Sequence, residues 1–246
     1  MGKNKEAEQL AALQELTDRA AIGEVLGVIK SGKEATVYLC ESTDPAREVV
    51  AAKVYRTRDV RGFADDATYR EGRLWRNNRY ARAIENKSRR GREFAFSAWV
   101  AAEYATLSRL HAAGADVPEP LGQSERVILM EYVEDAEGPA PPLSSVRLDC
   151  GEARRVFDVL LRNVELALSC DCVHGDLSAF NVLYAGGAVK IIDFPQAVDP
   201  RVNHSALSLL ERDIDRLCGY FARSGVERDG WAIARGMWSK FLRAEL

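Results

Sequence analysis

The chain has 246 residues, of which 47% are hydrophobic and 29% are charged, and these fractions are typical of a globular protein rather than of a disordered or repetitive one. The net charge of −3 excludes a polycation, and no apolar run is long enough to predict a membrane-spanning helix. Five cysteines, a low and odd number, argue against a disulfide framework and predict a cytoplasmic location.

The N-terminal region predicts a helix followed by a small antiparallel sheet. Leu10, Leu13 and Leu16 recur at three-residue spacing among polar residues, which is typical of an amphipathic helix, and we assign residues 1–24 to this element. Over residues 25–54 the pattern changes to short apolar stretches separated by a polar turn and by a turn that contains proline. Such a pattern favours strands joined by hairpins.

The segment 56–92 differs sharply in composition from the rest of the chain. It carries twelve Lys and Arg against five Asp and Glu, a charge of +7, which leaves −10 for the remainder. We expect a flexible, exposed insert here. It is either a solvated helix with salt bridges or a surface for a phosphate-rich partner such as RNA.

The second half of the chain predicts helices and short strands, and its Pro/Gly-rich connector at 137–142 is the best boundary between two lobes. We therefore predict an α+β fold with a small antiparallel N-terminal lobe, 25–136, and a reduced, mostly helical C-terminal lobe, 137–246. In the last helix, Trp231 and Trp238 are expected in the core. Helices are predicted at 94–112, 153–169, 205–223 and 230–243, and strands at 127–133, 182–184 and 189–192.

The strongest chemical signal is the sequence H-G-D-L-S-A-F-N at 174–181, which is followed twelve residues later by Asp193. Asp176 and Asn181 stand at the two ends of one loop, and Asp193 ends the adjacent strand, so three oxygen-bearing side chains can converge. An amide and a carboxylate suffice to hold Mg²⁺, which keeps several waters, and Asp176 is then available to accept a proton from a hydroxyl. The alternative is a loop whose polar residues only cap turns. The pattern resembles the catalytic and metal-binding loops of the protein-kinase-like superfamily.

A kinase-like site requires three features upstream of this loop. A phosphate-covering loop is represented by Gly32, the one glycine retained when Val37 is aligned with the valine of G-x-G-x-x-G-x-V. Lys53 ends an apolar strand, as the nucleotide-binding lysine of a kinase does. Glu103 lies in the middle of a predicted helix, where an unpaired charge would be costly, so it needs a partner such as this lysine.

Several further motifs together resemble the RIO family of atypical serine/threonine kinases. The resemblance runs from about residue 26 to residue 226 and favours the first subtype, which has a flexible loop at the place of the basic insert and lacks a winged helix. The absence of an A-P-E motif after Asp193 agrees with it. The motifs are S-G-K-E-A-T-V-Y at 31–38, K-V-Y-R at 53–56, the W-x-x-x-E of Trp99 and Glu103, A-G-A-D-V-P at 113–118, and I-D-F-P at 192–195.

This resemblance implies a two-lobed protein-kinase-like fold that uses ATP with Mg²⁺ or Mn²⁺. In the N-terminal lobe, Lys53 would contact the α- and β-phosphates and would be positioned by Glu103. The exposed loop above the triphosphate would contribute main-chain N–H groups and a positive charge. The loop residues are Ser31, Gly32 and Lys33.

In the C-terminal lobe, the resemblance implies that Asp176 is the catalytic base and that Asn181 and Asp193 hold the metal. It also implies a second role for Asp193, which would accept the phosphoryl group itself in an ATPase cycle. Main-chain groups of the hinge between the lobes would bind adenine. The hinge residues are Met130, Glu131 and Val133.

The resemblance implies phosphorylation of the protein itself or of another protein whose identity stays open, with ribosome maturation as the family setting and no membrane partner. Two other functions stay open. Small-molecule phosphotransferases of the aminoglycoside or choline type also carry H-G-D-x-x-x-x-N, although the loop at 31–35 and the short region after Asp193 argue against them. An ATP-gated module could instead bind ribosomal precursor RNA through the basic insert, without catalysis.

Overall fold

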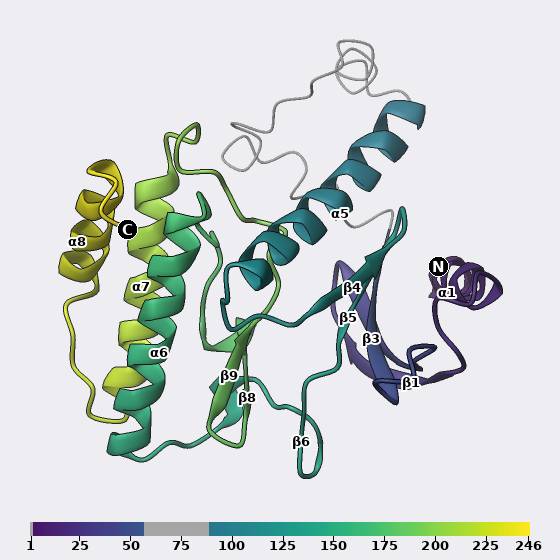
Figure 1. Cartoon of the computed structure of the whole chain (residues 1–246), viewed down its shortest axis with the longest axis horizontal. Coiled ribbons are helices and arrows are strands. Elements are labelled where there is room, and N and C mark those ends of the chain that lie inside the picture. Colours follow the sequence, from purple (N-terminus) through teal and green to yellow (C-terminus); the bar gives the residue numbers. More distant parts are fainter. Residues whose placement is uncertain (1, 57–88) are drawn as a thin grey trace. The chain divides into compact units, whose positions relative to one another are not determined.

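The computed structural model describes residues 2–56 and 89–246 (Figure 1). Most of the predicted basic insert, 57–88, lies outside the described residues, so its conformation and its partner stay predictions. In the two described ranges, no helix combines the length and the apolar character needed to cross a bilayer.

The described residues form two compact units, and the α+β fold class is confirmed. The first unit holds 2–56, 89–105 and 119–132, and the second holds 106–118 and 133–246. The predicted lobe limits at 25–136 and 137–246 stay predictions.

A five-stranded antiparallel sheet in the order β1-β2-β3-β5-β4 forms the centre of the first unit. The sheet expected over 25–54 is thereby confirmed, and the two later strands extend it. The β-branched and aromatic residues of β2 and β3 favour strands because they pack well on a pleated surface. The strands are β1 (Val25–Ser31), β2 (Ala35–Glu41), β3 (Val49–Tyr55), β4 (Pro120–Gln123) and β5 (Val127–Glu131).

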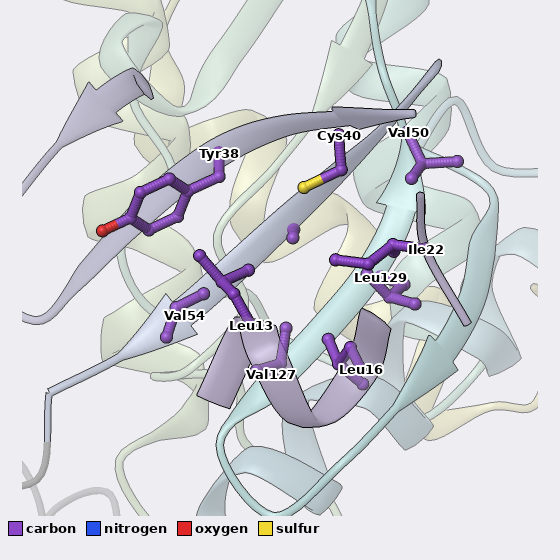
Figure 2. Packing of buried hydrophobic residues seen from close by; sticks show 10 residues of the cluster. Leu13, Leu16, Ile22, Tyr38, Cys40, Val50, Val54, Val127 and Leu129 are labelled. Carbon is purple, nitrogen blue, oxygen red and sulfur yellow. The ribbon is translucent and has the colours of Figure 1, made fainter. Parts of the chain in front are cut away.

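Helix α1 (Gly2–Asp18) lies within the predicted N-terminal segment and packs against this sheet. Figure 2 shows Leu13 and Leu16 of the helix beside strand residues such as Val127 and Val54. Burying a leucine side chain of this kind contributes about 1.5–3 kcal/mol. The helix is therefore an integral part of the first unit. The cluster consists of Leu13, Leu16, Ile22, Tyr38, Cys40, Val50, Ala52, Val54, Val127 and Leu129.

Helix α5 (Arg89–Ala112) belongs to the first unit up to residue 105 and to the second from residue 106. It buries Trp99 and Val100 in the first unit. Gly114, two residues after the last helical residue, has a φ of 85° in the left-handed region, and the Ala115 N–H donates to the Leu110 carbonyl. This is a glycine-terminated helix end, in which glycine adopts the left-handed conformation without a Cβ clash.

The second unit combines a bundle of three helices with a β-hairpin. Helices α6, α7 and α8 lie side by side in Figure 1, and α6 also contacts β9 of the hairpin. Aspartates cap α6 and α8: Asp149 accepts from the Glu152 N–H and Asp229 from the Ala232 N–H. The elements are β6 (Glu134–Asp135), β7 (Gly138–Pro139), η1 (Leu143–Ser145), α6 (Cys150–Ser169), η2 (Ala179–Asn181), β8 (Val182–Ala185), β9 (Ala188–Ile191), α7 (Ala206–Ala222) and α8 (Gly230–Leu242).

One expectation for α8 is wrong. Trp231 is 48% exposed, and it carries Arg235 over its ring at 5.9 Å instead of filling the core. Ala234 and Met237 provide the buried face of the helix. Tryptophan is large and is seldom fully buried, so its place in an amphipathic pattern does not settle which face meets the core.

Candidate active site

Lys53 on β3 and Glu103 on α5 form an ion pair in the first unit, with 2.7 Å between Lys53 Nζ and Glu103 Oε1. The side chains are only 12% and 5% exposed, respectively. The Tyr55 hydroxyl donates to the other oxygen of the same carboxylate, and the Lys53 ammonium lies 5.1 Å from the centre of the Tyr55 ring. A buried carboxylate requires such partners. The structure thus brings together the lysine and the glutamate that the sequence singled out.

The loop predicted to cover phosphates joins β1 to β2. Its three residues Ser31, Gly32 and Lys33 are exposed, and the Gly32 N–H donates to the Ala35 carbonyl at 2.9 Å, which closes the turn. Exposed main-chain groups and a lysine in a tight turn are suited to an anionic ligand.

Arg56, which directly follows β3, forms hydrogen bonds to this loop. Its guanidinium donates to the Gly32 carbonyl at 2.5 Å, to Ser31 Oγ at 2.7 Å and to Thr36 Oγ1 at 2.8 Å. The Thr36 hydroxyl also accepts from Gln9 Nε2 of α1 at 3.0 Å. A hydrogen-bonded chain therefore runs from the N-terminal helix to the loop, and sequence reasoning did not find it.

The predicted hinge residues Met130 and Glu131 lie at the end of β5, and Val133 begins the next stretch of the second unit. The Glu131 N–H donates to the Glu119 carbonyl at 2.8 Å, and the Val133 carbonyl accepts from the Ala140 N–H at 3.0 Å. The Val133 carbonyl therefore already accepts one bond, and the adenine contacts of these residues stay predictions.

In the second unit, His174 connects the loop 174–181 to the segment after β9. Its Nε2 lies 3.1 Å from the Ile192 carbonyl, and its Nδ1 lies 3.3 Å from the Asp176 N–H. Because a carbonyl only accepts and an N–H only donates, we assign the proton to Nε2 and leave Nδ1 as the acceptor. The His174 ring also packs against Phe194, with 4.7 Å between ring centres. The histidine thus holds the two predicted catalytic segments together.

Asn181 and Asp193 are carried by neighbouring ends of the β8–β9 hairpin. Val182 pairs with Ile191, and the Asn181 carbonyl accepts from the Ile192 N–H at 2.9 Å. The Asn181 side-chain amide donates to the Asp176 carbonyl at 2.9 Å. The backbone therefore places the predicted amide and carboxylate ligands on adjacent strand ends.

This donor set fits a hard divalent cation. The Asn181 side chain uses its nitrogen as a donor to the loop, so its oxygen is the atom suited to a metal. Asp193 is exposed and adopts a φ of 74°, a conformation that is uncommon outside glycine and that clusters at functional sites. Within the described ranges, no cluster of three or more His, Cys, Asp or Glu could hold a metal by itself. A pair of oxygen ligands that leaves most positions to water and phosphate is the arrangement that Mg²⁺ favours.

A family model of the RIO domain matches residues 36–231, most of the chain. The chain belongs to the RIO domain family. The match includes Lys53, Glu103, Asp176, Asn181 and Asp193.

Curated proteins similar to this RIO domain include "Serine/threonine-protein kinase rio1" of Schizosaccharomyces pombe, at 32% identity over 86% of this chain and 41% of that protein. "Serine/threonine-protein kinase RIO1" of Homo sapiens is 31% identical over 87% of this chain and 36% of that protein. "RIO-type serine/threonine-protein kinase Rio1" of Haloferax volcanii is 32% identical over 89% of this chain and 71% of that protein. The chain therefore spans about two fifths of the length of the two eukaryotic relatives.

Helix α7 of this RIO domain binds the predicted catalytic loop through Gly175. The Asp213 carboxylate, 1% exposed, accepts from the Gly175 N–H at 2.8 Å, and the Arg212 guanidinium donates to the Gly175 carbonyl. Burial raises the pKa of Asp213 to about 7, although two loop amides and two nearby arginines oppose this effect. Three consecutive charged residues between the buried Leu210 and Ile214 were the available sequence signal, and our sequence analysis missed it.

The same helix also reaches the side chain of the predicted catalytic base. Arg216 Nη1 lies 2.7 Å from Asp176 Oδ1, and both side chains are 42% exposed. Forty residues separate the two partners, so no local motif could reveal the pair.

Proposed function

We propose that this RIO domain is an atypical serine/threonine kinase that transfers the γ-phosphate of ATP to a hydroxyl group of itself or of another protein. The observation that carries the proposal is the shielded ion pair between Lys53 and Glu103, which fixes the Lys53 ammonium on the same sheet whose β1–β2 connection is the exposed glycine-containing loop. The printed names of the relatives and the family membership support a kinase over a small-molecule phosphotransferase.

In the first unit, each group has a distinct task toward ATP. Lys53 contacts the α- and β-phosphates, and Glu103 holds its ammonium in place. Main-chain N–H groups of the loop 31–33 that do not close the turn, together with the charge of Lys33, bind the terminal phosphates. Main-chain groups of Glu131 and Val133 bind the adenine.

In the second unit, Asp176 orients the acceptor hydroxyl and takes its proton. The hydroxyl oxygen forms a bond to the γ-phosphorus while the bond from that phosphorus to the bridging oxygen breaks, and ADP leaves. Asn181 and Asp193 would hold Mg²⁺, or Mn²⁺, which when bound neutralises charge on the phosphates. An attack by the Asp193 carboxylate would instead give an aspartyl phosphate and an ATPase cycle.

We place this activity in the cytoplasm and propose self-phosphorylation as its simplest form. A contact with ribosomal precursor RNA through residues 56–92 is supported by the charge of +7 on that segment. Affinity for RNA should then fall steeply as the salt concentration rises.

The deciding experiment incubates the protein with γ-labelled ATP and Mg²⁺. We expect label on the wild type, and we expect Asp176→Asn and Asp193→Asn to lose it, whereas Asp158→Asn, at an exposed position on α6, retains it. Label that resists acid and hydroxylamine indicates serine or threonine, and label released by hydroxylamine indicates an aspartyl phosphate. A wild type that neither becomes labelled nor turns over ATP would contradict the proposal.

A further inference from the structure

We infer that Arg216 is a positioning residue for Asp176, holding its carboxylate in the orientation that accepts the proton of the acceptor hydroxyl. This inference rests on the proposed function, which assigns the base. It adds a residue of α7 that neither the family motifs nor the proposed mechanism includes.

The first support is that both ends of the ion pair are anchored. Arg212 and Arg216 lie one turn apart on the same helix face, and the Arg212 guanidinium already binds the Gly175 carbonyl. The Asp213 carboxylate binds the Gly175 N–H, and Leu217, next to Arg216, is fully buried. The helix backbone that carries Arg216 is therefore fixed relative to the residue that precedes Asp176.

The second support is the direction of the contact. Arg216 Nη1 donates to Asp176 Oδ1, and this bond restrains rotation of the carboxylate about its side-chain torsions. We assign the other oxygen, Oδ2, to the acceptor hydroxyl. A guanidinium stays protonated at neutral pH, so Arg216 does not compete for the transferred proton.

The third support is the small contribution that this ion pair is expected to make to stability. Ion pairs between exposed side chains contribute little to stability, so removal of Arg216 should affect turnover rather than folding. The pair between Arg235 of α8 and Glu211 of α7, with 3.0 Å between Arg235 Nε and Glu211 Oε1, provides a control for the loss of another ion pair to α7, although Glu211 is only 10% exposed.

The experiment compares Arg216→Met, Arg216→Lys and Arg235→Met in steady-state phosphorylation with γ-labelled ATP. We expect Arg216→Met to lower kcat about tenfold while the KM for ATP stays within about twofold. Arg216→Lys should recover to within about threefold of the wild type, because an ammonium donates to Oδ1 but lacks the planar fork. Arg235→Met should match the wild type. Thermal unfolding of each variant checks that the fold is retained.

The outcomes separate this inference from the proposed function. If Asp176→Asn is as active as the wild type, the assignment of the base fails. If Asp176→Asn is inactive while Arg216→Met keeps the wild-type kcat, Arg216 forms only a surface ion pair and the inference is overturned. A rise in the KM for ATP at unchanged kcat would also overturn it, as would equal losses in Arg216→Met and Arg235→Met. If Arg216→Met unfolds, Arg216→Lys carries the test, and a tenfold loss of kcat in the folded Arg216→Lys variant would contradict the inference.

Discussion

The Lys53 ammonium and the Glu103 carboxylate meet at 2.7 Å although fifty residues separate them in the chain. Tyr55 completes the arrangement by donating to the same carboxylate. A nearly buried charge of either sign is costly alone, so each residue depends on the other.

Glu103→Gln should therefore lower the free energy of unfolding by about 3 kcal/mol, because it leaves the Lys53 charge buried without its counter-ion. Urea unfolding at neutral pH measures this effect, and phosphorylation should fall with it. Tyr55→Phe is the matched control and should cost only about 1 kcal/mol, since it removes one hydrogen bond and no charge. Equal effects of the two substitutions would contradict the assigned importance of the ion pair.

Arg56→Met should raise the KM for ATP about fivefold while kcat stays within about twofold, because the three bonds that order the loop 31–36 are lost without a change at the reacting groups. Steady-state kinetics measures both constants. Arg19→Met, which removes an exposed ion pair of the helical N-terminal region, should leave both unchanged. A fall in kcat at constant KM would contradict this role.

The pH dependence of stability should reveal Asp213. Burial raises its pKa from 3.8 to about 7 in the folded state, so the folded protein binds the proton more tightly than the unfolded chain. The contribution of this carboxyl to the free energy of unfolding is therefore favourable below pH 4, decreases from about pH 4 to about pH 7, and stays low above that. Urea unfolding measures the free energy of unfolding at about pH 5 and about pH 8. The decrease of this free energy from the lower to the higher pH should be smaller for Asp213→Asn than for the wild type. Identical decreases would refute the assignment.

The turn of the β8–β9 hairpin gives a prediction that concerns stability alone. Gly186 and Gly187 have φ values of 54° and 91°, and a Cβ on Gly187 would lie 3.1 Å from Arg155 Nη2, whereas nothing lies within 4 Å of one on Gly186. Gly187→Ala should cost about 2 kcal/mol and Gly186→Ala about 1 kcal/mol. Thermal unfolding ranks the two variants, and the reverse order would be inconsistent with the steric argument.

Elements with strong local signals could be predicted from the sequence. The hairpin of β8 and β9 follows from two short apolar runs around Gly186 and Gly187, and α6 follows from its helical periodicity. The pairing of Lys53 with Glu103 could be predicted because a glutamate within an apolar helix face needs a cation.

The residues that hold the candidate site residues in place could not be predicted in this way. Asp213 and Arg216 meet the loop across 38 and 40 residues, and only the tertiary packing of α7 makes them neighbours. The chain from Gln9 to Arg56 depends likewise on where α1 lies on the sheet. Trp231 was assigned to the core because its spacing from Trp238 fits one face of a helix. This spacing alone does not identify which face of α8 packs against α7.

The contact between α7 and Gly175 also determines the order in which parts of this protein can fold during synthesis. The loop ends at Asn181, and the helix that binds both main-chain groups of Gly175 begins 25 residues later, at Ala206. Contacts between distant parts of a chain form only once the intervening loop has closed. A nascent polypeptide that stops short of Ala206 thus contains all residues of the sequence 174–181 but lacks the α7 contacts that hold the main chain of Gly175.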